Sequence, residues 1–311
     1  MRQCVFCLLR AQKDVFKGYA AKAAKKHALI NHVKIISMTK LRIFLGYFIL
    51  IIISLSMLLP FFAMLSLSFM PGSEIFSYPP KLFSKNITVQ NYFSVFTSIP
   101  VTRYFLNSLF VATITTIGQV FFAALAGYAF ARLKFKGKDI LFFIFLITMM
   151  IPPQVNIIPL FFLMRELHLV DTYQALIIPG FFGGFGVFML RQYFLNLPKE
   201  LEESSKIDGC NIFQMFFKIA LPLALPAVAT LAIFTFVSSW NSFMWPLIIT
   251  SSDSMRTLPV GLAAFKGSFR EVTMWGDLLA CAVICTLPVV GIFLLGKKYF
   301  INDLLQGGVK E

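Results

Sequence analysis

Long apolar stretches divide this chain, and each is bounded by polar or charged residues. A helix that crosses a bilayer needs about 20 consecutive apolar residues. Six stretches reach that length without a run of interior charges, and they cover residues 43–70, 104–130, 140–164, 173–195, 222–249 and 273–296. The strands of a transmembrane barrel would be about half as long. The pattern therefore predicts an all-α integral membrane protein with six transmembrane helices.

One polar segment, residues 198–222, separates the fourth and fifth stretches. Pro198 and Glu200 suit the first turn of a helix, and Gly209 suits its left-handed end. Beyond the glycine, apolar residues recur at the spacing of one helical face, at Ile212, Met215, Phe216 and Ile219. The segment therefore predicts two short helices around a glycine turn, which form a docking surface for another protein.

Composition and charge agree with a membrane location. Hydrophobic residues make up 58% of the chain and charged residues 14%, and the mean hydropathy is +0.79. Of the 28 Lys and Arg residues, 21 fall in the terminal segments and the loops at 131–139 and 191–218, and 7 fall in the alternate loops. Because such residues gather on the cytoplasmic side, both termini and the 198–222 segment are expected to be cytoplasmic. The basic residues of this chain flank the spans and do not form one basic face, which argues against nucleic-acid binding.

The chain offers little for metal or catalytic chemistry. Cys4 and Cys7 form one Cys-x-x-Cys pair without further ligands, and His27, His32 and His168 are scattered. No catalytic constellation is visible, and no Gly-x4-Gly-Lys-Ser/Thr loop is present to cradle ATP phosphates. We therefore expect no metal, no catalytic residue and no cofactor on this chain, which we interpret as a transport subunit and not an enzyme.

Residues 1–37 precede the first stretch and carry eight basic residues and one acid, Asp14. They lack the apolar core of a signal peptide. Two interpretations stay open. One is a basic cytoplasmic extension lying on the anionic inner leaflet, and the other is an over-long gene start with Met38 as the natural first residue. The six-helix transmembrane domain is expected to occupy residues 38–311.

The third and fifth stretches contain residues that are unusual at membrane depth. In the third, Met149 is followed by Pro152 and Pro153, and such prolines free backbone carbonyls that only a protein interior or a watery cavity accommodates. A broken helix beside a solute path and a packing kink are both open. Aromatic rings and polar side chains suit an uncharged polyhydroxyl solute, and the fifth stretch combines them at Ser239, Trp240, Asn241 and Phe243. An interfacial aromatic belt is the alternative for this group.

The 198–222 segment resembles the EAA loop of bacterial ABC-importer permeases, in which Glu-Ala-Ala is followed by Asp-Gly and then by Ile-x-Leu-Pro. The matching residues here are Glu203, Ser204, Ser205, Asp208, Gly209, Ile219, Leu221 and Pro222. Two serines replace the alanines, and both residue types are small enough for close helix contact. The resemblance implies the ABC type I importer permease fold with cytoplasmic coupling helices.

The likeness extends over about residues 40–311. Further matching segments are 149–159, 240–246, 256–262 and 299–310, with a departure at Asn302 and Asp303. Together they resemble the second membrane subunit of maltose-type carbohydrate importers. Within ABC importers, a permease for a polyamine, anion or amino acid is the alternative. A secondary transporter is a further alternative, although the spans hold almost none of the buried charges that such proteins commonly use.

The resemblance also implies partners and roles. It implies a bacterial inner-membrane location, a homologous second permease, an extracytoplasmic solute-binding protein and an ATPase dimer that carries ATP and Mg. Within the coupling loop, Glu203 is expected to make a charge contact with the ATPase, and Gly209 to set the bend. Ile212, Phe216 and Ile219 are expected to anchor the second helix.

Overall fold

The computed structural model describes residues 42–79, 83–84, 86–268 and 275–308, and it describes side chains up to residue 263 and from 275 to 297. The basic segment 1–37 lies outside the described residues. The chain has two compact units, residues 1–63 and 64–311. The first described helix, Arg42–Ser68, begins in one unit and ends in the other.

All regular elements in the described ranges are helical. Up to residue 196 they are α2 (Gly72–Ile75), α3 (Gln90–Ser98), α4 (Val101–Arg132), α5 (Lys138–Met150), α6 (Pro153–Glu166), α7 (Tyr173–Ile177), η1 (Ile178–Phe181) and α8 (Gly184–Asn196). The remainder are α9 (Glu200–Ile207), α10 (Ile212–Met215), the π-helical η2 (Phe216–Ala220), α11 (Leu221–Leu223), α12 (Leu225–Trp240), α13 (Met244–Ile249), α14 (Leu258–Ser268) and α15 (Trp275–Gly308).

Four helical segments in the described chain are long and apolar enough to cross a membrane, namely Arg42–Ser68, Val101–Arg132, Tyr173–Asn196 and Trp275–Lys297. Two bent pairs raise the number to six if each pair is one span. The prediction of an all-α membrane protein is therefore confirmed, and the predicted six spans correspond to these four segments and the two bent pairs of helices.

The third predicted span is broken where the prolines stand. α5 and α6 meet at an angle of 102°. Ile151 and Pro152 are both extended, with ψ values of 118° and 132°, because a residue that precedes proline is driven out of the helical region. Pro153 then starts α6, where its missing N–H costs nothing. The broken helix, one of the two interpretations of these prolines, is therefore what the structure has, and a solute path beside it stays a prediction.

The fifth predicted span, 222–249, is also interrupted. The segment Ile212–Leu223 meets α12 at 76°, and Pro222 and Pro226 flank that bend. At the other end α12 stops at Trp240, and a turn separates it from α13. The straight part of this span is therefore only Leu225–Trp240.

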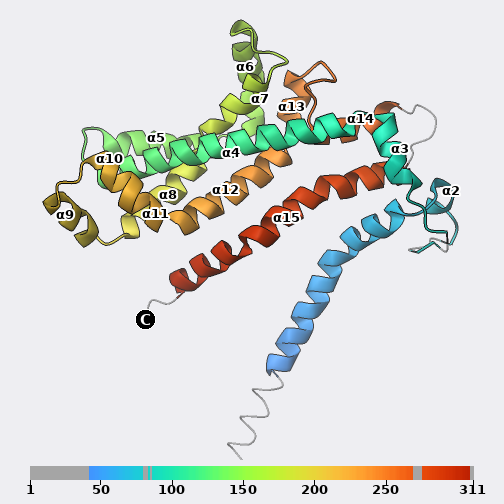
Figure 1. Ribbon diagram of the computed structural model, residues 1–311, viewed down its shortest axis with the longest axis horizontal. Coiled ribbons are helices and arrows are strands. Elements are labelled where there is room, and N and C mark those ends of the chain that lie inside the picture. Colours follow the sequence, from blue (N-terminus) through green and yellow to red (C-terminus); the bar gives the residue numbers. More distant parts are fainter. Residues whose placement is uncertain (1–41, 80–82, 85, 269–274, 309–311) are drawn as a thin grey trace, which may run out of the picture. The chain divides into compact units, whose positions relative to one another are not determined.

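In residues 64–311, α8 and α12 pack along α4, and α15 packs against α12 (Figure 1). Small residues permit the close approach of α4 and α8. A methyl group on Gly127 would lie 3.0 Å from the Arg191 amide nitrogen, and one on Gly186 would lie 3.0 Å from the Ala123 Cβ. Near this contact, Tyr128, Phe194 and Phe216 form part of a buried cluster that links α4, α8 and η2.

Candidate functional site

The predicted coupling loop forms two short helices around Gly209. α9 ends in a Schellman motif, in which the Gly209 amide donates to the Lys206 carbonyl (3.1 Å) and the Cys210 amide donates to the Ser205 carbonyl (2.9 Å). Gly209 has a φ of +79°, which other residues adopt only at a cost. The structure therefore gives Gly209 the left-handed position that its sequence context predicts.

The second helix begins with a capping box. The Gln214 amide donates to Asn211 Oδ1 (2.8 Å), and the Asn211 amide donates to Gln214 Oε1 (3.0 Å). A π-helical turn, Phe216–Ala220, follows and widens the helix before Pro222. Because that turn departs from the ordinary helical period, the face expected from the sequence does not stay in register along its length.

Burial divides the predicted coupling residues into two groups. Ser205 and Phe216 are buried. Ile219 is half-buried and lines a small cavity together with residues of α9. Pro222 adjoins the 76° bend at the start of α12. Glu203, Ser204, Asp208 and Gly209 are exposed. Ile212 is also exposed, by 50%, so it does not pack into the bundle of this chain, and its role as an anchor stays a prediction. It is the first residue after the cap, where its side chain clears the bundle.

An ion pair that the sequence did not indicate joins the coupling loop to the bundle. Arg132 is the last residue of α4, and Glu202 lies in the first turn of α9. The Arg132 Nε atom is 3.1 Å from Glu202 Oε1, which makes an ion pair, but the N–H group does not point at this oxygen and forms no hydrogen bond with it. A second guanidinium nitrogen of Arg132 donates to the Leu197 carbonyl (2.5 Å). Only 6% of the Arg132 side chain and 20% of the Glu202 side chain are exposed. Glu202 thus holds α9 to α4, and its neighbour Glu203 faces outward.

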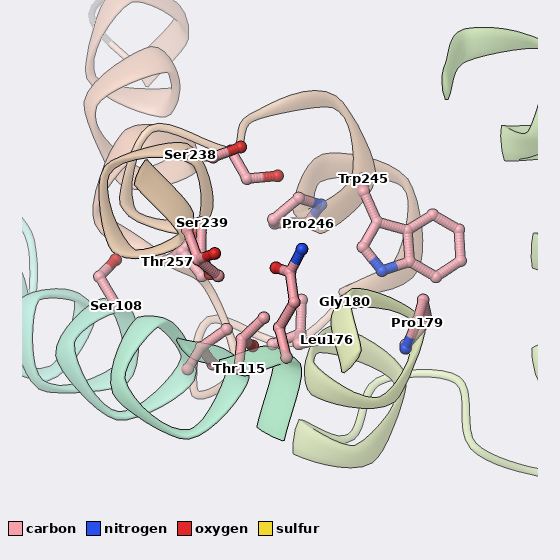
Figure 2. A pocket seen from close by; sticks show the side chains of 14 residues that line it. Ser108, Thr115, Leu176, Pro179, Gly180, Ser238, Ser239, Trp245, Pro246 and Thr257 are labelled. Atoms are coloured by element: carbon pink, nitrogen blue, oxygen red, sulfur yellow. The ribbon is translucent and has the colours of Figure 1, made fainter. Parts of the chain in front are cut away.

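A polar cavity of about 190 Å³ lies further along α4 (Figure 2). Its walls come from α4, α7, η1, α12, α13 and the segment before α14. The fourteen lining residues are Ser108, Val111, Thr115, Gln119, Leu176, Pro179, Gly180, Thr235, Ser238, Ser239, Ser242, Trp245, Pro246 and Thr257. Eight of them carry a hydroxyl or an amide side chain, and none is charged.

Of the predicted substrate-path residues, the cavity includes Ser239 alone. Trp240 is 1% exposed, donates its Nε1 hydrogen to the Cys285 carbonyl (3.0 Å) and stacks on Phe236, so it is a core residue. Asn241 is exposed and Phe243 half-buried at the turn after α12. The remaining predicted residues, Met149, Pro152 and Pro153, lie exposed at the break between α5 and α6.

A periodic signal in the sequence could have located the missed lining residues. Ser108, Thr115 and Gln119 are separated by seven and four positions, which places them on one face of α4. Thr235, Ser238 and Ser242 repeat intervals of three and four in and just after α12. Polar residues that share a helical period inside apolar spans are thus a better guide to the cavity than the aromatic cluster at 240–245.

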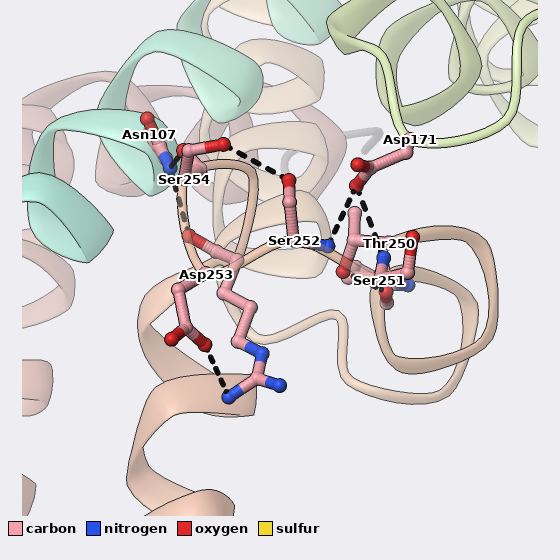
Figure 3. Close-up of polar contacts among 9 residues, drawn as sticks. Asn107, Asp171, Thr250, Ser251, Ser252, Asp253 and Ser254 are labelled. Carbon is pink, nitrogen blue, oxygen red and sulfur yellow. Dashed lines mark hydrogen bonds and ion pairs between the residues drawn. The ribbon is translucent and has the colours of Figure 1, made fainter.

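The loop at residues 250–257 ends at Thr257, which lines the cavity. Figure 3 shows the polar contacts that hold this loop near Asn107 and Asp171. Asn107 of α4 donates to the carbonyls of Ser254 and Arg256 (both 2.9 Å), and the Leu258 amide donates to Ser108 Oγ (2.8 Å). Opposite α4, Asp171 Oδ1 accepts hydrogen bonds from the amides of two consecutive loop residues, Ser251 (3.0 Å) and Ser252 (3.1 Å). The loop is therefore fixed from two sides.

The charge of Asp171 is stabilised by this loop. Partial burial raises the pKa of its carboxyl, but the hydrogen bonds from Ser252 and Ser251 outweigh that effect and hold the pKa below its ordinary value of 3.8. Asp171 has a φ of +62°, a conformation that Asp and Asn adopt more readily than most residues. Its own amide donates to the Ile249 carbonyl (2.9 Å), which ties the same turn to the end of α13.

Comparisons with known proteins agree with this architecture. The model of the family "Binding-protein-dependent transport system inner membrane component" matches residues 119–304. The chain is 39% identical to the arabinooligosaccharides transport system permease protein AraQ of Bacillus subtilis, over 83% of this chain and 92% of that protein. It is 34% identical to the trehalose/maltose transport system permease protein MalG of Thermococcus litoralis, over 84% and 94%.

A solved structure gives the same result for the fold. A chain from a bacterial ABC transporter involved in the import of the acidic polysaccharide alginate superposes with a TM-score of 0.74 at 26% identity, covering 83% of this chain and 97% of that one. The importer-permease fold and the resemblance to carbohydrate ABC-importer permeases are both confirmed. This chain therefore belongs to the family of binding-protein-dependent transport system inner membrane components, which are transport subunits and not enzymes.

Proposed function

We propose that this chain is one of two permease subunits of an ATP-driven ABC importer that moves a sugar or oligosaccharide into the cytoplasm. The uncharged, hydroxyl-rich cavity carries the proposal, because it suits a neutral polyhydroxyl solute. An anion or polyamine would leave its hydration shell there without a compensating charge, at a high cost in free energy. The sugar transport named for the relatives of this chain supports the same substrate class.

The coupling loop supports a partner ATPase dimer as the source of energy. α9 and α10 expose Glu203, Asp208 and Phe213 and are held to the bundle by buried residues, as expected of a surface that is pushed by another protein. ATP and Mg would bind to that partner. In this proposal the loop and both termini face the cytoplasm, and a binding protein delivers the solute on the other side of the inner membrane.

Uptake by the reconstituted complex tests this function. Proteoliposomes would contain this chain, its second permease and its ATPase, and each candidate binding protein would be added outside. We expect ATP-dependent uptake of a neutral sugar such as arabinotriose or maltotriose, and none of spermidine, glutamate or glycerol-3-phosphate. Uptake of only a charged solute would overturn the substrate class, and uptake by this chain alone without ATP would overturn the importer.

A further inference from the structure

The coupling helix α9 is held to the bundle by few contacts. Of its eight residues only Ser205 is buried, and the Ser205 hydroxyl donates to the Leu201 carbonyl of the same helix. Within the described residues, the pair of Arg132 and Glu202 is the only ion pair or hydrogen bond that joins α9 to a helix of the bundle. Because segments with few buried contacts open and shift at low cost in free energy, α9 is free to move against the bundle.

Two polar groups beside the Glu202 carboxylate make no hydrogen bond. The Arg132 Nε–H group is one of them, since it does not point at the carboxylate oxygen 3.1 Å away. The other is the Tyr128 hydroxyl, which is buried and has no partner in the described chain. Tyr128 stands four positions before Arg132, on the same face of α4. Native proteins satisfy almost all such groups, so this arrangement leaves two hydrogen bonds of the cluster unmade.

A small cavity lies between α4 and α9, and both Tyr128 and Glu202 line it. Its volume is about 10 Å³, close to the least space that holds one water molecule. Apart from these two residues, the side chains of the wall are apolar except for Ser205, whose hydroxyl is already bonded to Leu201. Glu202 is the only charged side chain on the wall, and a carboxylate is a strong acceptor for a hydroxyl. It is therefore the best available partner for the Tyr128 hydroxyl.

We propose that α9 has a second position on the bundle, in which the Glu202 carboxylate accepts hydrogen bonds from the Tyr128 hydroxyl and from Arg132 Nε. The position described above is the first, with both groups unpaired. Tyr128 is then a positioning residue for energy coupling, because it fixes where the coupling helix rests. The inference rests on the proposed function, in which α9 engages the ATPase.

The two donors are fixed in place, and the acceptor is the part that moves. The Tyr128 ring packs edge-on against Phe194 of α8, with ring centroids 5.5 Å apart, and lies 5.2 Å from the ring of Phe216. Arg132 is held by its hydrogen bond to the Leu197 carbonyl. Glu202 reaches both donors if α9 moves far enough to close a void about the size of one water molecule.

Such a pair of positions suits a helix that another protein pushes. The second position gains charge-assisted hydrogen bonds, whereas the first leaves Glu202 partly in contact with solvent. An ATPase that binds the exposed side of α9 shifts the balance by the difference in its affinity for the two positions. Tyr128 then sets how strongly the bundle resists or assists that shift.

Hydrogen exchange on the assembled complex tests the second position. Exchange rates of the amides at 204–208 would be measured in the complex of this chain, its second permease and its ATPase, without nucleotide and after trapping with ATP, Mg and vanadate. Tyr128→Phe keeps the ring and removes the hydroxyl. We expect wild-type rates in one state and rates raised about tenfold or more in the other, because a hydrogen bond to a charged group is lost in that state alone. The ratio of ATP hydrolysed to solute imported should rise as well.

Tyr173→Phe is the matched control. The Tyr173 hydroxyl donates to Asn107 Oδ1 (2.7 Å), and neither residue belongs to the coupling loop. Its loss should lower the melting temperature in both states and leave the exchange rates of α9 unchanged in both.

A double-mutant cycle identifies the acceptor. In a Glu202→Ala background, Tyr128→Phe should have no effect on α9 in either state, because the partner of the hydroxyl is already gone. If Glu202→Ala fails to assemble, the comparison of Tyr128→Phe in the two states decides the result alone.

The outcomes separate this inference from the function on which it rests. Wild-type rates for Tyr128→Phe in both states, or an equal rise in both, would overturn the second position and leave the importer standing. An effect that persists in the Glu202→Ala background would also overturn it, since another group would then be the acceptor. A wild-type complex that assembles with no ATPase would overturn the proposed function first.

Discussion

The Nε atom of Arg132 lies 3.1 Å from Oε1 of Glu202, and this contact joins the last residue of α4 to the first turn of α9. Through this contact, α4 meets the loop that is expected to engage the ATPase. Removing one partner leaves the other charge poorly solvated, a strongly destabilising change.

Substitution of either residue should therefore weaken the fold and the coupling together. We expect Glu202→Gln or Arg132→Met to lower stability by about 3 kcal/mol, the low end for a buried pair, since Glu202 keeps some solvent contact. The ratio of ATP hydrolysed to solute imported should rise. Thermal unfolding and paired ATPase and uptake assays measure the two effects.

The exposed neighbour provides a control for that experiment. Glu203→Gln removes a similar charge without touching Arg132, so it should leave the melting temperature unchanged while reducing ATPase binding. The exchanged pair Arg132→Glu with Glu202→Arg should recover part of the lost stability. If the exchanged pair recovers no stability, and Glu203→Gln loses as much stability as Glu202→Gln, the ion pair has no special role.

Gly209 should be sensitive to substitution for conformational reasons alone. Its φ is +79°, and an added Cβ would meet no atom within 4 Å. Gly209→Val should cost about 1–2 kcal/mol locally and uncouple ATP hydrolysis from uptake. Gly137→Val is a matched control, because Gly137 has a φ of +80° and equally open surroundings but lies between α4 and α5. Equal coupling defects in both variants would contradict a specific role for Gly209.

Two aromatic residues of the second coupling helix should behave in opposite ways. Phe216 is 3% exposed among Tyr128 and Phe194, whereas Phe213 is 70% exposed. Phe216→Ala should lower stability by about 3–5 kcal/mol. Phe213→Ala should leave the melting temperature within experimental error and weaken co-purification of the ATPase. A stable Phe216→Ala variant would show that this end of the bundle is packed differently.

Trp240 should prove to be a stability residue and not a substrate residue. Trp240→Phe removes the hydrogen bond to the Cys285 carbonyl and part of a buried ring, so we expect a loss of about 1–3 kcal/mol. Sugar binding to the complex should be unchanged at a temperature where the variant is folded. A large rise in the Kd for sugar would return Trp240 to the solute path.

Asp171 should make the loop at 250–257 sensitive to acid. Its pKa is lower in the folded protein than in the unfolded chain, so its stabilising contribution is complete above about pH 4 and is lost as the pH falls through the folded value. Asp171→Asn tolerates the same backbone conformation but removes the charge. Amide hydrogen exchange at Ser251 and Ser252 should accelerate in this variant at neutral pH, and should change little at Leu258, whose amide donates to Ser108 Oγ.

Local patterns made part of this structure predictable. Apolar length identified the spans, and the glycine and cap residues around 198–211 fixed α9 and its end, because these signals are carried by neighbouring residues. The break at Pro152 was foreseen as one of two alternatives, and its angle was not. The π-helical turn Phe216–Ala220 was missed, since it shifts the helical face beyond Met215 and leaves no clear mark in the sequence.

Long-range contacts were harder to foresee. The pairing of Arg132 with Glu202 joins residues 70 positions apart, and the cavity collects Ser108, Gly180 and Ser239 from helices that are distant in sequence. Trp240 was misassigned because an aromatic residue in a span is equally suited to a solute path and to a core. Only the packing of α12 against α15 distinguishes the two.

α4 runs unbroken for 32 residues, about 48 Å at ~1.5 Å per residue, which exceeds a hydrocarbon layer of about 30 Å. Thr115 and Arg132 stand about 26 Å apart on it by the same rise, and the cavity and the ion pair share no side chain. We therefore expect solute preference and ATPase pairing to be separable traits. A chimera that joins the cavity half of one relative to the coupling half of another needs to preserve only the helical register across α4.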